Sequence, residues 1–106
     1  MSTVHRKDKK IILCVQNDRD GAELVEITLS RHHYCVDLAS TVDEGLRDVQ
    51  QNLYDLILLD YHFSDGSGPE LCRLIRQFDP NTPILFYSAE ARDRQIQAAL
   101  DAGAQI

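Results

Sequence analysis

The stretch LILLDYHFSDGSGPEL, residues 56–71, decides how this chain folds. It opens with four apolar residues, Leu56 to Leu59, and this unbroken run predicts a strand that is covered on both faces, as in a parallel sheet. The run ends on a carboxylate, Asp60, and a loop separates Asp60 from a helix that opens near Pro69. The sequence therefore predicts a core strand that carries an acid to the edge of a sheet.

Strands and helices alternate along the rest of the chain. Apolar runs predict further strands at 11–15, 35–39 and 84–87, and the polar Asp37 suggests that the second of these lies at an edge. Apolar residues at helical spacing follow each strand, with Asp20 and Thr41 as expected N-caps and Glu44 completing a capping box. A helical stripe that includes Phe78 follows 56–71, and a last helix is expected to end at Gly103. The repeated order strand–helix predicts an α/β fold with a doubly wound parallel sheet and right-handed crossovers.

Composition limits the possible classes of protein. The chain has 106 residues, which favours one domain, and its net charge of −6 argues against direct nucleic-acid binding. The only basic cluster is Arg6, Lys7, Lys9 and Lys10, and we interpret residues 1–9 as a flexible leader before a domain at 10–106. No signal peptide or membrane span is evident, so a cytoplasmic location without a membrane partner is expected. The three cysteines form no C-x-x-C pair, so neither a zinc site nor a disulfide framework is indicated.

Polar residues follow three of the predicted strands. Asn17 and Asp18 come after the first strand, Asp60 ends the third, and Ser88 ends the fourth. Taken singly, Asp18 or Ser88 could simply cap a helix. Ligands of doubly wound sheets bind beyond the carboxyl ends of the strands, so Asp18 and Asp60 would meet there if their strands are neighbours. Two close carboxylates repel one another unless a cation intervenes, and hard oxygen ligands suit Mg²⁺.

These features together give the chain a family resemblance. From about Lys10 to Ile106 it resembles a response-regulator receiver domain of two-component signalling. The resemblance rests on the acid after the first strand, the LILLD strand with its D-x-x-x-x-x-G loop, the hydroxyl that ends the fourth strand, and AALDAGA near the end. It implies a flavodoxin-like fold and a signalling module that is not an enzyme.

The resemblance also implies roles for single residues. Asp60 would accept a phosphoryl group from a histidine kinase or a phosphotransfer protein. Mg²⁺ would be bound by Asp18, by Asp60 and by the main-chain carbonyl of His62, with Asn17 contributing through a water molecule. Such chemistry is reasonable, because a carboxylate can attack a phosphohistidine while the cation offsets charge.

Three residues at the end of the fourth predicted strand complete the implied site. The hydroxyl of Ser88 and the backbone N–H of Ala89 would bind the phosphoryl group. Tyr87 stands beside Ser88 and could act in switching, or it could be a buried strand residue. The local change at Ser88 would be communicated to a partner through the nearby surface.

The chain departs from the family pattern in two places. The family usually has two acids after the first strand, whereas Asn17 replaces one of them here. The sequence stops at Ile106, about where a fifth strand, a phosphoryl-binding lysine and a fifth helix would follow. We therefore expect four strands, with the fifth strand and helix missing, and an apolar edge at 84–87 that is open to self-association. A fragment of a longer regulator is an alternative explanation.

Two other functions compete with a phosphorylated switch. A pseudo-receiver would keep the fold and act as an interaction module without phosphorylation, and Asn17 and the missing lysine favour it. An enzyme on the same kind of sheet is disfavoured. A phosphatase would need an acid where His62 stands, and a flavin site would need a phosphate-binding loop where Gln16-Asn17-Asp18 stands.

Overall fold

The central sheet has four parallel strands. The computed structural model describes residues 9–86. Within them β1 (Ile11–Val15), β2 (Cys35–Ala39), β3 (Leu56–Leu59) and β6 (Ile84–Phe86) form a sheet in the order β2-β1-β3-β6. This confirms the predicted parallel α/β sheet and the edge position of β2. The expectations about residues 1–8, a last helix, and a fifth strand and helix lie outside the described residues.

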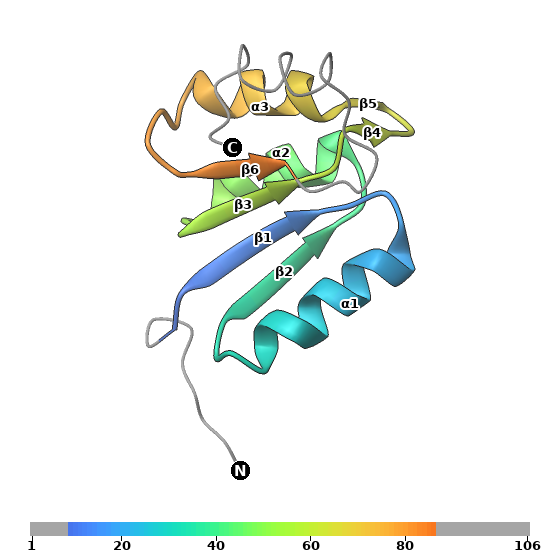
Figure 1. Ribbon diagram of the computed structural model, residues 1–106. Coiled ribbons are helices and arrows are strands. Elements are labelled where there is room, and N and C mark those ends of the chain that lie inside the picture. Colours follow the sequence, from blue (N-terminus) through green and yellow to red (C-terminus); the bar gives the residue numbers. More distant parts are fainter. Residues whose placement is uncertain (1–8, 87–106) are drawn as a thin grey trace.

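Helices cover both faces of this sheet (Figure 1). Helix α1 (Arg19–Ser30) lies on one face, beside β2 and β1, whereas α2 (Val42–Gln51) and α3 (Gly68–Arg76) pack together on the other face. Because strand side chains alternate between faces, Leu13 and Val15 point towards α2 and α3, while Ile12 and Cys14 belong to the α1 face. Because helices cover both faces of the sheet, β1 and β3 are apolar on both faces.

The ends of the helices confirm part of the sequence prediction and correct the rest. Thr41 caps α2, and its side chain accepts a hydrogen bond from the N–H of Glu44. The cap of α1 is Asp18, so the prediction of Asp20 as N-cap was wrong. Asp18 accepts a hydrogen bond from the N–H of Asp20, and the helix begins at Arg19, two residues earlier than a cap at Asp20 would place it. Phe78 was expected in the buried stripe of α3, but that helix ends at Arg76 and Phe78 is 46% exposed.

A short antiparallel hairpin follows β3 and was not predicted. It consists of β4 (His62–Phe63) and β5 (Gly66–Ser67), and it lies between β3 and the start of α3 (Figure 1). Two-residue strands are too short to be recognised from alternation. Phe63 is buried, so this hairpin is attached to the core by one of its own side chains.

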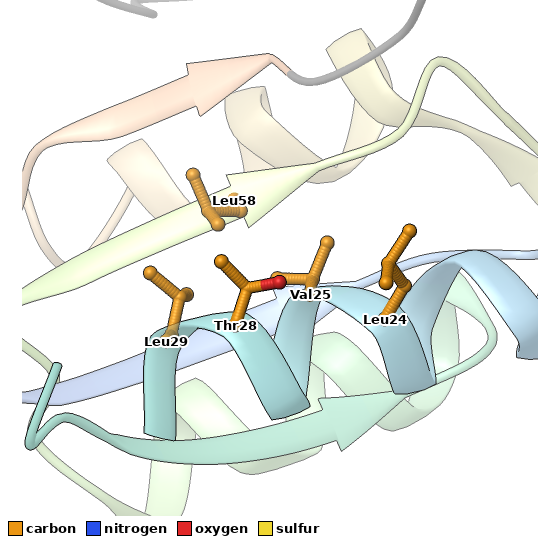
Figure 2. Close-up of a pocket in the computed structure, with 5 residues that line it drawn as sticks. All are labelled: Leu24, Val25, Thr28, Leu29 and Leu58. Atoms are coloured by element: carbon orange, nitrogen blue, oxygen red, sulfur yellow. The ribbon is translucent and has the colours of Figure 1, made fainter. Parts of the chain in front are cut away.

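The core fills the space between the sheet and the α2–α3 layer. Its fully buried side chains come from strands and helices far apart in the sequence: Leu13, Val15, Ile57, Leu59, Leu71, Cys72, Ile75 and Ile84. On the other face, α1 and β3 line an open apolar pocket of about 260 Å³, formed by Leu24, Val25, Thr28, Leu29 and Leu58 (Figure 2). None of these residues was a predicted site residue. Among the described residues, no helix has the length and apolarity needed to cross a membrane.

Candidate functional site

Asp60 is held at the carboxyl end of β3 by its own backbone. Its N–H donates to the carbonyl of Val15 at 2.9 Å, which continues the β1–β3 pairing one residue past β3. Its carboxylate oxygen Oδ1 accepts a hydrogen bond from the N–H of Tyr61 at 2.7 Å. The residue is half-buried. The acid therefore has a fixed position and still reaches the surface.

Gly68 lies directly against the backbone of Asp60, and this close approach was not predicted from the sequence. The N–H of Gly68 donates to the carbonyl of Tyr61 at 2.8 Å. A Cβ atom on Gly68 would lie 2.0 Å from the carbonyl oxygen of Asp60 and 2.6 Å from Cε1 of Phe86. The buried ring of Tyr61 packs against the ring of Phe86, with 4.7 Å between their centroids. Because no side chain fits at position 68, the start of α3 can contact the backbone of Asp60 directly.

Asp18 lies beyond the end of β1 and is exposed. Its Oδ1 accepts the hydrogen bond from Asp20 N–H at 3.2 Å, so the carboxylate also serves as the cap of α1. Gly21 leaves room for it, since a Cβ there would lie 3.2 Å from Asp18 Oδ2. The preceding Gln16 is buried, and its Oε1 lies 3.4 Å from the N–H of Asp18. Gln16 and the exposed Asn17 line a cavity of about 270 Å³ at this edge.

The sheet order brings the two acids to the same edge. β1 and β3 are direct neighbours, and Val15 pairs with Leu59, so Asp18 and Asp60 both follow the carboxyl ends of adjacent strands. This satisfies the condition that the sequence analysis set for them. His62 is exposed and lies on β4, two residues after Asp60. The predicted roles of Tyr87, Ser88 and Ala89 lie outside the described residues.

The donors expected at this edge are hard oxygens, the type of ligand that Mg²⁺ prefers. Between residues 9 and 86, no group of three or more His, Cys, Asp or Glu side chains is arranged to hold a metal ion. The donors expected from the sequence are the carboxylates of Asp18 and Asp60, the main-chain carbonyl of His62 and the amide oxygen of Asn17, and all of them are oxygen atoms. Mg²⁺ is commonly bound by one or two carboxylates and keeps several water ligands, so this limited set of hard oxygens is chemically suitable.

Cys14 is a buried cysteine on β1 whose pKa is affected by Asp60, and this effect was not predicted from the sequence. Burial, and secondarily the negative charge of Asp60, raises the pKa of the Cys14 thiol from 9.0 to about 11. The thiol is only 2% exposed. Cys14 is thus a protonated core residue at neutral pH, as expected for a thiol in an apolar strand.

Comparisons with known proteins agree with this geometry. The family model "Response regulator receiver domain" matches residues 12–106. The Response regulator ArlR of Staphylococcus saprophyticus is 38% identical over 93 residues, which cover 88% of this chain and 42% of that protein. The Transcriptional regulatory protein DltR of Streptococcus agalactiae is 34% identical with the same coverage. The chain therefore spans less than half the length of these curated relatives.

Solved structures give the same result. A two-component response regulator from Clostridium difficile superposes with a TM-score of 0.86 at 31% identity, covering 92% of this chain and 79% of that one. A CheY-like receiver domain protein from Methanospirillum hungatei superposes with a TM-score of 0.86 at 27% identity, covering 91% of this chain and 77% of that one. The chain belongs to the response regulator receiver domain family of two-component signalling.

Proposed function

We propose that this chain is a phosphorylation-dependent switch in which Asp60 accepts a phosphoryl group from a histidine kinase or phosphotransfer protein. The observation that carries the proposal is the fixed position of Asp60. Hydrogen bonds from its own N–H to Val15 and from Tyr61 N–H to Oδ1 hold it at the carboxyl end of β3. A rigidly held, partly exposed carboxylate is suited to attack an incoming phosphorus atom.

The geometry of Asp60 favours one of its two oxygens as nucleophile. Because Oδ1 already accepts the Tyr61 N–H, we infer that Oδ2 attacks. A bond forms from Oδ2 to phosphorus while the phosphorus–nitrogen bond of the phosphohistidine breaks, and the imidazole nitrogen keeps that electron pair. The N–H of Tyr61 then remains as a donor to the carboxyl group throughout the transfer.

The metal-binding part of the proposal involves Asp18, Asp60, the carbonyl of His62 and a water held by Asn17. Mg²⁺ bound there would offset negative charge on the transferring phosphoryl group. Asp18 can contribute because its carboxylate is exposed and its hydrogen bond to the first turn of α1 is long, 3.2 Å. Asn17 supplies no charge, so we expect weaker Mg²⁺ binding than a site with three carboxylates would have. Ser88 and Ala89 keep their proposed phosphoryl-binding roles, and Tyr87 its proposed switching role.

Intact-mass spectrometry tests this function. The full chain is incubated with Mg²⁺ and acetyl phosphate, and we expect the mass of one phosphoryl group to be added. Asp60→Asn is the matched control, since the amide keeps an oxygen that can accept the Tyr61 N–H but is not a nucleophile. No added mass in the wild-type chain, or the same added mass in Asp60→Asn, would reject Asp60 as the acceptor.

A specific observation supports one alternative, a pseudo-receiver that binds partners without phosphorylation. Asn17 takes the place of a second acid, and no group of three acidic side chains is arranged for a metal among residues 9–86. Under this alternative a folded chain would gain no phosphoryl mass and would leave MgCl₂ unbound. The mass experiment and an Mg²⁺ titration therefore separate the two functions.

Self-association remains a proposal as well. In the described sheet β6 pairs with β3 and stands at an edge, and its Leu85 is 36% exposed. An apolar strand at the edge of a sheet can add a strand from a second chain. Sedimentation of the chain over a wide concentration range tests this, and a monomer at every concentration would refute it. We also propose a cytoplasmic location, where a kinase would reach Asp60. A further proposal is that residues 10–106 form the domain, behind a flexible leader.

A further inference from the structure

Asp65 connects two parts of the chain that are distant in sequence. It lies on the turn of the β4–β5 hairpin, between Phe63 and Gly66. Its Oδ1 accepts a hydrogen bond from the N–H of Val42 at 2.9 Å, and its Oδ2 accepts one from the N–H of Asp43 at 3.0 Å. One exposed carboxylate thus binds the first two N–H groups of helix α2 from across 22 and 23 residues of sequence.

These two bonds complete a cap that α2 cannot complete by itself. The first four N–H groups of a helix have no partner within the helix. Thr41 satisfies one of them, because its Oγ1 accepts from the N–H of Glu44, while its carbonyl accepts the first ordinary helical bond, from Gly45. Asp65 satisfies two more, those of Val42 and Asp43. The positive end of the helix dipole also favours a carboxylate here, and the two backbone hydrogen bonds lower the pKa of Asp65.

The same bonds restrain the hairpin that follows Asp60. Each hairpin strand has only two residues, and a hairpin of that size is not stable in isolation. Its other attachments include the buried Phe63, the bond from Gly68 N–H to the carbonyl of Tyr61, and the Ser67 hydroxyl, which accepts from Glu70 N–H. These attachments lie on the strands or at their base, whereas the bonds of Asp65 attach the turn itself to α2.

We propose that Asp65 is a positioning residue whose carboxylate clamps the β4–β5 hairpin to the N-terminus of α2 and thereby sets the position of the His62 carbonyl. The part concerning the metal rests on the function proposed above, since His62 is the main-chain ligand suggested there. The clamp itself does not depend on that function. Thr41 offers a matched control, because its side chain caps the same helix end through Glu44 and makes no hydrogen bond to the hairpin among the described residues.

Amide hydrogen exchange tests the clamp without metal or phosphate. Asp65→Ala and Thr41→Ala both remove a cap from α2, and both should lower global stability. Only Asp65→Ala should also increase exchange of the hairpin amides, by about fivefold, because capping bonds are of that strength. In Asp65→Asn the exchange rate of the hairpin amides should lie between the rates in Thr41→Ala and Asp65→Ala. The side-chain oxygen of asparagine can accept one N–H, but its NH₂ group opposes the other. Equal hairpin exchange in Asp65→Ala and Thr41→Ala would overturn the proposal.

An Mg²⁺ titration tests the link to the metal. The Kd for MgCl₂ is measured from backbone amide NMR shifts of Tyr61 and His62 in wild type and both variants. Loss of a group that orients a metal ligand typically weakens binding about 10-fold or more, so we expect this for Asp65→Ala and no change for Thr41→Ala. An unchanged Kd in Asp65→Ala would overturn the role in metal binding. If the wild-type chain binds no Mg²⁺, the proposed function fails, while hydrogen exchange still decides the clamp.

Discussion

Substituting Gly68 by alanine should disturb Asp60 although Gly68 has no side chain to lose. The added Cβ would lie 2.0 Å from the carbonyl oxygen of Asp60, whereas carbon–oxygen contacts normally begin near about 3.3 Å. One of the two backbones must therefore move by about 1.3 Å. The second near atom is Cε1 of Phe86, at 2.6 Å, in a ring that packs against Tyr61. Neither neighbour is the end of a flexible chain, so the overlap cannot be relieved by rotating a side chain.

The expected cost follows from this overlap. Overpacking a filled site costs about 1–3 kcal/mol, and the upper part of that range applies when a backbone atom must shift. Alanine is favoured over glycine within a helix by up to about 1 kcal/mol, which offsets part of the cost in the first turn of α3. We expect Gly68→Ala to lower the free energy of unfolding by about 2 kcal/mol. Urea denaturation followed by circular dichroism measures this change.

The matched control is Gly21→Ala in α1. The nearest atom to a Cβ there is a carboxylate oxygen of Asp18, at 3.2 Å, and the next neighbours are at 3.7 Å. Because that side chain can shift slightly, the helix-propensity gain should leave Gly21→Ala as stable as the wild type or more so. Gly68→Ala should also slow addition of phosphoryl mass to Asp60 in molecules that remain folded. A Gly68→Ala variant with wild-type stability and wild-type phosphorylation would refute the argument that this close approach fixes Asp60.

Three further predictions concern charges around the site. The pKa of the Cys14 thiol is raised from 9.0 to about 11, so the folded state retains a proton that the unfolded chain releases, and stability should fall as pH rises across that window. Cys14→Ala should lack this alkaline decline in urea-denaturation midpoints, and an identical decline would contradict the assignment. The pKa of Asp65 is lowered below 3.8. Its contribution to folding stability is therefore present above that pH and is lost as the pH falls through its folded-state pKa. Asp65→Asn should reduce the loss of unfolding free energy at low pH. An unchanged loss would contradict the stabilising role of the Asp65 carboxylate. Asp18→Ala should lose about 1 kcal/mol of stability with the bond to Asp20 N–H, whereas Asp18→Asn should keep that stability. Mg²⁺ titration should show weakened binding in both, and normal binding in either would remove Asp18 from the metal site.

Local patterns in the sequence determined the strands and the acids that follow them. The runs at Ile11–Val15 and Leu56–Leu59 are confirmed to the residue, because a strand covered on both faces needs continuous apolarity. Given parallel strands, Asp18 and Asp60 had to follow their carboxyl ends. Thr41 was also predictable as a cap, since capping uses a residue and its own next three positions.

Contacts between distant segments were decided only in the tertiary structure. Asp65 caps a helix that begins 23 residues earlier, and no local pattern carries that information. Gly68 looks like an ordinary loop glycine until the fold brings the Asp60 carbonyl to where its Cβ would be. Asp18, not Asp20, caps α1 because the chain leaving β1 turns into the helix two residues sooner than apolar spacing suggested. The sequence by itself determined which residue reaches the edge of the sheet, and the packing of the hairpin, α2 and α3 around Asp60 determined how firmly it is held there.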